Sequence, residues 1–207
     1  MADNVARYGF RWVKSRTGSG LPVIEQYPVA SAYQAAPGGV NVDLNIGDPV
    51  KKVNDGTVAL CAAGDQVFGI VADIAPYWDG AKKVRANRLP GGTTYGSVLD
   101  RQSRVGIILA GENIFECIVD DNTTATTQAG YTAFIGENVD VSINQSAGDT
   151  HAYPKLHITG HETGGATKVW RIVSLSDRID TDYSGLNVPL YVTGNLIQQA
   201  PDQTTSV

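Results

Sequence analysis

The chain has 207 residues, of which 42% are hydrophobic, 18% charged and 8% aromatic, and its formal net charge is −5. This composition predicts a soluble globular protein rather than a disordered one, because a chain of this length buries roughly 70% of its unfolded surface without metals or disulfides. The acidic balance argues against a nucleic-acid-binding coat, which would carry a basic stripe. The apolar runs are too short to span a membrane, and no secretory signal is recognisable at the start.

The first twenty residues differ from the rest of the chain in charge and aromatic content. They carry four cations and one aspartate, a net charge of +3, so the remaining residues carry −8. Aromatic rings alternate with these cations and are costly to leave in water. One interpretation is a solvated flexible terminus. We favour an extended arm that lies on another protein surface, and its predicted protein-binding residues are Arg7, Tyr8, Phe10, Arg11, Trp12 and Lys14.

From residue 40 onwards the dominant hydrophobic period is two, which is typical of β-strands. Residues 40–46 alternate apolar and polar side chains, and residues 47–73 place short apolar segments between Gly, Asn and Asp turns. Gly69 lies inside one such segment and indicates a bulge or a close backbone approach. The predicted strands are residues 40–46, 50–53, 57–61, 67–73, 81–85, 105–110, 113–119, 131–135, 139–143, 156–159, 168–174 and 187–193.

These strands follow one another without a clear helical pattern between them, so the predicted fold class is all-β. The expected architecture is a single β-barrel or a jelly-roll-like sandwich of short antiparallel strands. We predict an arm over residues 1–20, a β-rich domain over 21–197 and a polar tail over 198–207. A second candidate binding patch is Tyr77, Trp78 and Tyr95, on a long loop over residues 77–95; the alternative is ordinary packing of these rings at the base of the loop.

Residues with catalytic or metal-binding potential are few. Cys61 and Cys117 lie in apolar segments and are predicted to be buried and reduced, because no Cys-x-x-Cys or Cys/His cluster accompanies them. His157 and His161 are four residues apart but lack the helical HExxH context of a zinc site. Asp120 and Asp121 are more typical of a strand end than of a paired-carboxylate site. We therefore predict no enzyme activity, metal or cofactor; an enzyme on this scaffold would need the Asp120/Asp121 or His157/His161 groups.

One stretch carries a resemblance to a known family. The sequence GDPVKKVNDGTVALCAAGDQVFGIVAD, residues 47–73, resembles the strand–turn–strand core of small head-decoration, or cement, proteins of tailed bacteriophages. The segments RYGFRWVKS (7–15), LPGGTTYG (89–96) and WRIVSLSDR (170–178) are also similar to phage virion proteins encoded near a major capsid protein. These segments touch both ends and the middle of the chain.

The resemblance implies a non-enzymatic, β-rich module that oligomerises and clamps neighbouring capsid subunits. Its expected partners are the major capsid protein and further copies of itself as a dimer or trimer, with no nucleic acid and no membrane. Its expected location is the outer capsid surface of the virion, after synthesis in the host cytoplasm. The alternative is another phage virion component, a tail-fibre or carbohydrate-binding β-module that would use Tyr77, Trp78 and Tyr95 as a stacking platform.

Overall fold

The computed structural model describes residues 9–18, 20–30, 43–54, 56–79, 82–89, 103–120, 125–142, 154–162, 167–179, 181–184 and 187–198. The chain is all-β, as the sequence predicts, with one short helix. The elements are β1 (Arg11–Ser15), β2 (Glu25–Pro28), β3 (Leu44–Asn45), β4 (Pro49–Lys52), β5 (Val58–Leu60), β6 (Gly69–Ile74), β7 (Tyr77–Asp79), β8 (Lys82–Val84), β9 (Arg88–Leu89), β10 (Arg104–Leu109), β11 (Asn113–Ile118), α1 (Gln128–Thr132), β12 (Asn138–Ser142), β13 (Lys155–Glu162), β14 (Trp170–Leu175) and β15 (Pro189–Gly194).

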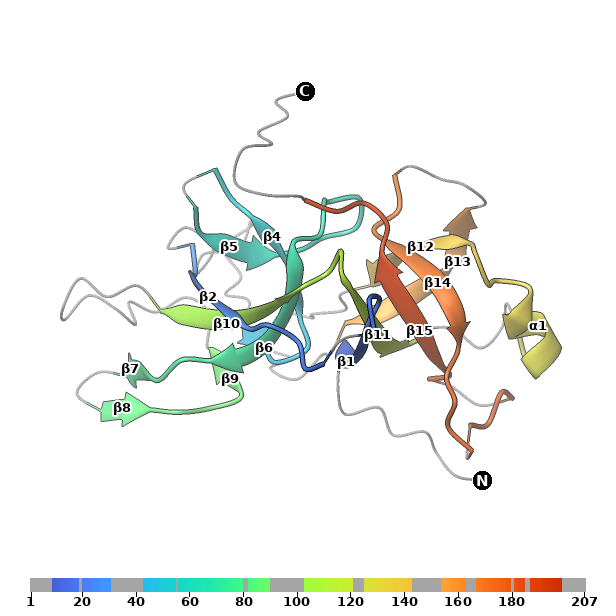
Figure 1. Ribbon diagram of the computed structural model, residues 1–207, viewed down its shortest axis with the longest axis horizontal. Helices are drawn as coiled ribbons and strands as arrows, with labels where there is room; N and C mark the ends of the chain where they lie inside the picture. The colour runs from blue at the N-terminus through green and yellow to red at the C-terminus, as the bar shows by residue number, and fades with distance from the viewer. Residues whose placement is uncertain are drawn as a thin grey trace.

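Two antiparallel sheets form the body, and Figure 1 shows them side by side. One has the strand order β1-β11-β15-β14-β12-β13, and the other has the order β2-β10-β6-β4-β5. We call them the six-stranded and the five-stranded sheet. Strands β10 and β11 are consecutive in the chain but belong to different sheets, so the turn between them carries the chain from one sheet to the other.

Neither sheet closes into the continuous barrel that was one of the two predicted architectures. A single parallel bridge, between Val119 and Leu156, connects the end of β11 to β13 in the six-stranded sheet. A similar bridge between Val29 and Val58 connects the residue after β2 to β5 in the other sheet. Among the described residues, each sheet therefore bends back toward itself, but an isolated bridge stands where a closed barrel would have a full ladder.

The hydrophobic core has two parts that meet at β6 and β10. Ile70 and Ile108 belong to the larger cluster, which packs against the six-stranded sheet. Their neighbours Val71 and Ile107 belong to the smaller cluster, which packs against the five-stranded sheet. This division follows from the period of two, because successive side chains on a strand point to opposite faces. Two sheets whose cores lie on opposite faces of β6 and β10 are compatible with the other predicted architecture, a sandwich.

The predicted strand at residues 131–135 is wrong, because this segment lies in and after helix α1. The side chain of Thr127 accepts a hydrogen bond from the Gly130 amide at 3.1 Å and caps the helix start. Tyr131 is buried and its ring lies 6.1 Å from that of Tyr183. A one-turn helix is too short to show a helical period, so its apolar residues resemble those of a strand.

Candidate functional site

Residues 11–15 of the predicted arm form β1, the edge strand of the six-stranded sheet. The strand pairs antiparallel with β11 through Arg11 opposite Glu116, Trp12 opposite Phe115, Lys14 opposite Ile114 and Ser15 opposite Asn113, with an irregularity between Trp12 and Lys14. The pairing continues past the strand, since the Arg16 amide donates to the Glu112 carbonyl at 2.8 Å. The described part of the arm is thus docked on its own body. Arg7 and Tyr8 lie outside the described residues.

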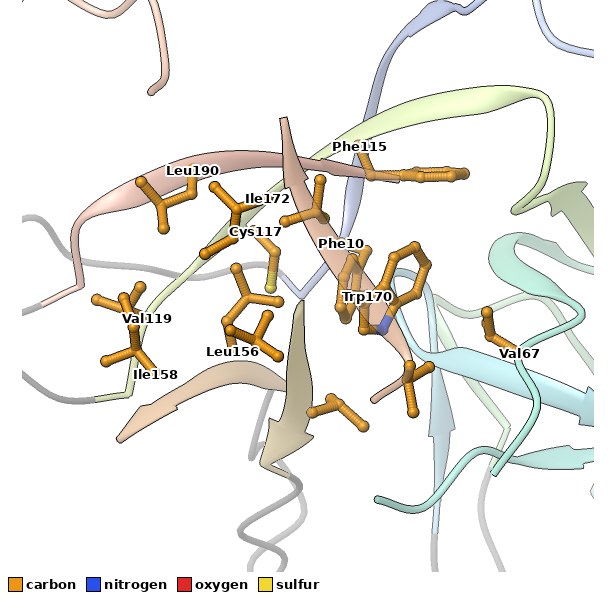
Figure 2. Packing of buried hydrophobic residues seen from close by; sticks show 14 of the residues in the cluster. Phe10, Val67, Phe115, Cys117, Val119, Leu156, Ile158, Trp170, Ile172 and Leu190 are labelled. Carbon is orange, nitrogen blue, oxygen red and sulfur yellow. The ribbon is translucent and has the colours of Figure 1, made fainter. Parts of the chain in front are cut away.

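Phe10 is a core residue of this chain. It is 3% exposed, and its ring stacks on the ring of Trp170 at 4.4 Å, as Figure 2 shows. Its amide donates to the Gly47 carbonyl at 2.8 Å. The preceding Gly9 has no room for a side chain, because a Cβ there would lie 2.6 Å from the Gly47 carbonyl oxygen. Phe10 is predicted to bind a partner surface, whereas within one chain its ring is buried and anchors the arm to the body.

Arg11 and Trp12 also bind within the chain. The Arg11 guanidinium contacts the buried carboxylate of Glu116 at 3.1 Å, and Arg178 contacts the same carboxylate at 2.7 Å. Ser176 donates a third interaction to Glu116 at 2.8 Å. The Trp12 indole N–H donates to Asn113 Oδ1 at 2.9 Å. Two guanidinium groups and one hydroxyl thus satisfy a carboxylate that would be costly to bury alone.

Two cations of the arm face solvent. The side chain of Lys14 is exposed, and the exposed Arg16 reaches the Gly111 carbonyl at 3.4 Å. We call this pair the basic edge. Both residues belong to the first twenty, which carry a net charge of +3 against −8 for the rest of the chain.

The segment that joins β1 to β2 exposes apolar side chains. In this connector, residues 17–24, Leu21 is 86% exposed, Val23 73% and Ile24 48%. Six large hydrophobic side chains are exposed among the residues that the structure describes, and half of them lie in the connector. Apolar groups gathered in this way usually mark a contact surface. The basic edge and the connector together form the candidate docking surface.

The sequence analysis missed the connector. The letters LPVI at 21–24 lie between a glycine-rich turn and a strand, and they look like the start of that strand. Their signal was three large apolar residues within four positions, next to Gly18 and Gly20. Only the backbone path shows that these side chains point away from both cores.

The second predicted patch is not a platform of exposed rings. Tyr77 is buried in the smaller core, which agrees with the alternative that it packs at the base of the loop. Its strand β7 forms a hairpin with β8 inside the predicted long loop. Trp78 follows Tyr77 in β7, but the structure does not place its side chain, and Tyr95 lies outside the described residues. A stacking surface built on Tyr77 is therefore excluded in this conformation.

One histidine–carboxylate pair is present on the six-stranded sheet. His157 Nδ1 lies 2.7 Å from Asp120 Oδ2, and the half-exposed imidazole faces solvent. The second oxygen of Asp120 accepts from the Ile158 amide at 3.4 Å, which fixes the carboxylate at the end of β11. For nucleophilic catalysis, such a pair would also need a nucleophilic side chain within hydrogen-bond reach of the imidazole. Among the described residues, no three His, Cys, Asp or Glu side chains gather as metal ligands would.

Three buried titratable groups have shifted pKa values. Burial raises the pKa of Asp48 to about 8, and its Oδ1 has no hydrogen-bond partner among the described residues. Burial likewise raises the pKa of Cys61 to about 12 and raises that of Cys117. Both cysteines are free and buried, as predicted. Because a thiolate is the reactive form, neither cysteine is a nucleophile in this fold.

Comparisons with known proteins identify no relative of this chain. The chain matches no family model, and no curated protein or solved structure is significantly similar to it. Within the described part of the chain, no helix is long and apolar enough to cross a membrane.

Proposed function

We propose that this protein is a non-enzymatic capsid decoration, or cement, protein of a tailed bacteriophage. In this role it binds the outer surface of the major capsid protein and bridges neighbouring subunits. The observation that carries the proposal is the candidate docking surface, in which the exposed Lys14 and Arg16 are followed along the chain by the exposed Leu21 and Val23, in a protein of net charge −5.

The chemistry of this surface suits a protein partner. Exposed apolar side chains gain free energy when another surface covers them, at about 25 cal/mol for each Å² of apolar area. The flanking cations favour an acidic patch on the partner and disfavour a basic one. A small contact of this kind is weak alone, but many copies on a repeating lattice act through their effective concentration. A decoration protein needs such a surface and no catalytic centre.

The family resemblance adds support from a different part of the chain. The motif at residues 47–73 forms β4, β5 and β6, in which β4 pairs with both of the other strands. The strand–turn–strand pattern for which the motif was singled out is therefore a real substructure. It belongs to the five-stranded sheet and contributes Val50, Val58 and Val71 to the smaller core.

The test is binding of the purified protein to empty capsids, followed by co-sedimentation and electron cryomicroscopy. Lys14→Glu/Arg16→Glu reverses the basic edge, and Lys82→Glu/Lys83→Glu on the exposed strand β8 is the matched control with the same change in net charge. We expect the first variant to lose about tenfold or more in affinity at low salt and the control to bind normally. Equal binding by both variants would exclude the basic edge as the shell contact.

The images decide the function itself. Ordered density on the outer shell at local symmetry axes is expected. A bare shell, or density confined to the tail, would overturn the decoration role and make a carbohydrate-binding module the next function to test.

A further inference from the structure

The described part of the arm is held by contacts with the body of its own chain. Phe10 stacks on Trp170 and its amide donates to Gly47, Arg11 contacts Glu116, and β1 pairs with β11. Gly9 fits closely against the Gly47 carbonyl and Pro154. We call the surface that these contacts define, made by β11, Gly47, Pro154 and Trp170, the groove. It fits the arm of this chain, whichever copy supplies that arm.

The connector does not restrict the arm to the body of its own chain. Leu21 and Val23 face solvent, and Gly18 and Gly20 have positive φ angles of 73° and 70° in a turn that joins the arm to the body. A Cβ at either glycine would meet nothing within 4 Å among the described residues. An exposed, loosely packed hinge between a docked element and its groove is the arrangement from which proteins exchange identical elements.

We propose that two copies of this chain exchange their N-terminal arms, so that residues 9–15 of each copy occupy the groove of the other. Every arm–groove contact is retained in the exchanged pair, because the two bodies are identical. The gain comes at the connectors, which pass each other between the two bodies and cover the Leu21 and Val23 side chains that one chain leaves exposed. The proposal concerns the protein alone and does not depend on a capsid. In the exchanged pair Leu21 and Val23 are covered by the other copy, so the basic edge of Lys14 and Arg16 is the part of the candidate docking surface that stays open to a shell.

Mass action sets the conditions for exchange. An arm on a short linker sees its own groove at an effective concentration on the order of millimolar. Exchange therefore has to draw on the connector contact, on crowding of copies at high concentration, or on arms that dock while two chains fold together. The dimer fraction is expected to rise with protein concentration, and mixing of two preformed samples is expected to be slow because the docked arm must first leave.

Light scattering after size-exclusion chromatography gives the first measurement on the full chain. We expect a species of about twice the 21.9 kDa of one chain that grows with concentration. Leu21→Ser/Val23→Ser is expected to lower this fraction several-fold. The matched control is Ile179→Ser, which changes a fully exposed apolar side chain in the loop after β14. A single-chain mass at every concentration, or a dimer unaffected by Leu21→Ser/Val23→Ser, overturns the proposal.

A crosslink then identifies whose arm fills the groove. Arg16 and Glu112 are both exposed and lie side by side where the arm meets the turn before β11, since the Arg16 amide donates to the Glu112 carbonyl at 2.8 Å. Cysteines at these two positions lie within reach of a short bis-maleimide, whereas the native Cys61 and Cys117 are buried and do not compete in the folded protein. Chains with Arg16→Cys are co-expressed with chains carrying Glu112→Cys, and a covalent pair forms only if the arm of one docks on the other.

The control carries both cysteines in one chain. A covalent pair from the mixed chains supports exchange. Crosslinks found only inside single chains overturn it, even if the protein is a dimer. Loss of capsid binding with exchange intact would point to a failure of the proposed function and not of the exchange.

Discussion

Replacing Phe10 by alanine tests whether the arm is part of the fold. The ring is 3% exposed and stacks on Trp170 at 4.4 Å within the larger core. Removing a buried Phe side chain costs about 3–5 kcal/mol, and about 1 kcal/mol of that is expected from the lost aromatic pair. For a chain of about 200 residues, each kcal/mol lowers the melting temperature by roughly 2–4 °C, so the expected drop is roughly 6–20 °C.

The assay is urea denaturation followed by tryptophan fluorescence, because the buried Trp170 lies against the altered site. Phe10→Leu keeps most of the apolar volume and is expected to cost less than about 1.5 kcal/mol. Ile179→Ala changes a fully exposed side chain and is expected to stay within about 0.5 kcal/mol of the unaltered protein. A Phe10→Ala protein as stable as the Ile179→Ala control would refute the docked arm. For the same reason, deletion of residues 1–16 is not a clean test of binding, because it removes a core ring together with the surface.

Two further substitutions test polar side chains that are bonded to backbone groups. Asp48 has its pKa raised to about 8 in the fold but ionises near pH 4 when unfolded, so the free energy of unfolding is expected to fall by up to about 1.4 kcal/mol per pH unit as the pH rises between these values. Asp48→Asn removes this pH dependence and is expected to stabilise the protein at pH 7 but not at pH 4 in urea titrations. The control, the exposed Asp177→Asn, is expected to keep the pH dependence of the unaltered protein. Parallel pH profiles for all three proteins would contradict the assignment of the dependence to Asp48. The Gln198 side chain accepts from the Lys52 amide at 2.6 Å and donates to its carbonyl at 2.9 Å, so Gln198→Ala is expected to cost about 1–3 kcal/mol and to speed amide exchange at Lys52, with the exposed Gln66→Ala as the neutral control. Unchanged exchange at Lys52 would mean that this contact does not hold the C-terminal segment.

The last of these residues lies at a predicted boundary. Gln198 is predicted to be the first residue of a polar tail, and its side chain instead pairs with the backbone of Lys52 at the end of β4. Next to it, Ile197 forms a parallel bridge with Val67, so the chain end fastens the six-stranded to the five-stranded sheet. Polar composition indicates solvent contact on average. It does not show that one amide can satisfy both backbone groups of a distant residue.

Local pattern determined the strands but not the helix. The period of two gave most strand positions within two residues, and Gly69 was singled out as a close approach, which the structure confirms because a Cβ there would lie 2.5 Å from the Ile108 carbonyl oxygen. Burial of Cys61 and Cys117 also followed from their apolar neighbours. The segment at 131–135 failed because the cap that makes it helical, Thr127, depends on one side-chain hydrogen bond.

The sequence by itself determined an all-β chain with a basic, aromatic N-terminus, because alternation, turn residues and charge are local properties that need no partner to be read. Only the tertiary structure decided that Phe10 faces inward while Leu21 and Val23 face outward. Hydrophobicity ranks all three as core residues, and the choice among them depends on which side chains find a closed surface. Trp170, some 160 positions away in the chain, supplies that surface for Phe10 and for neither of the others.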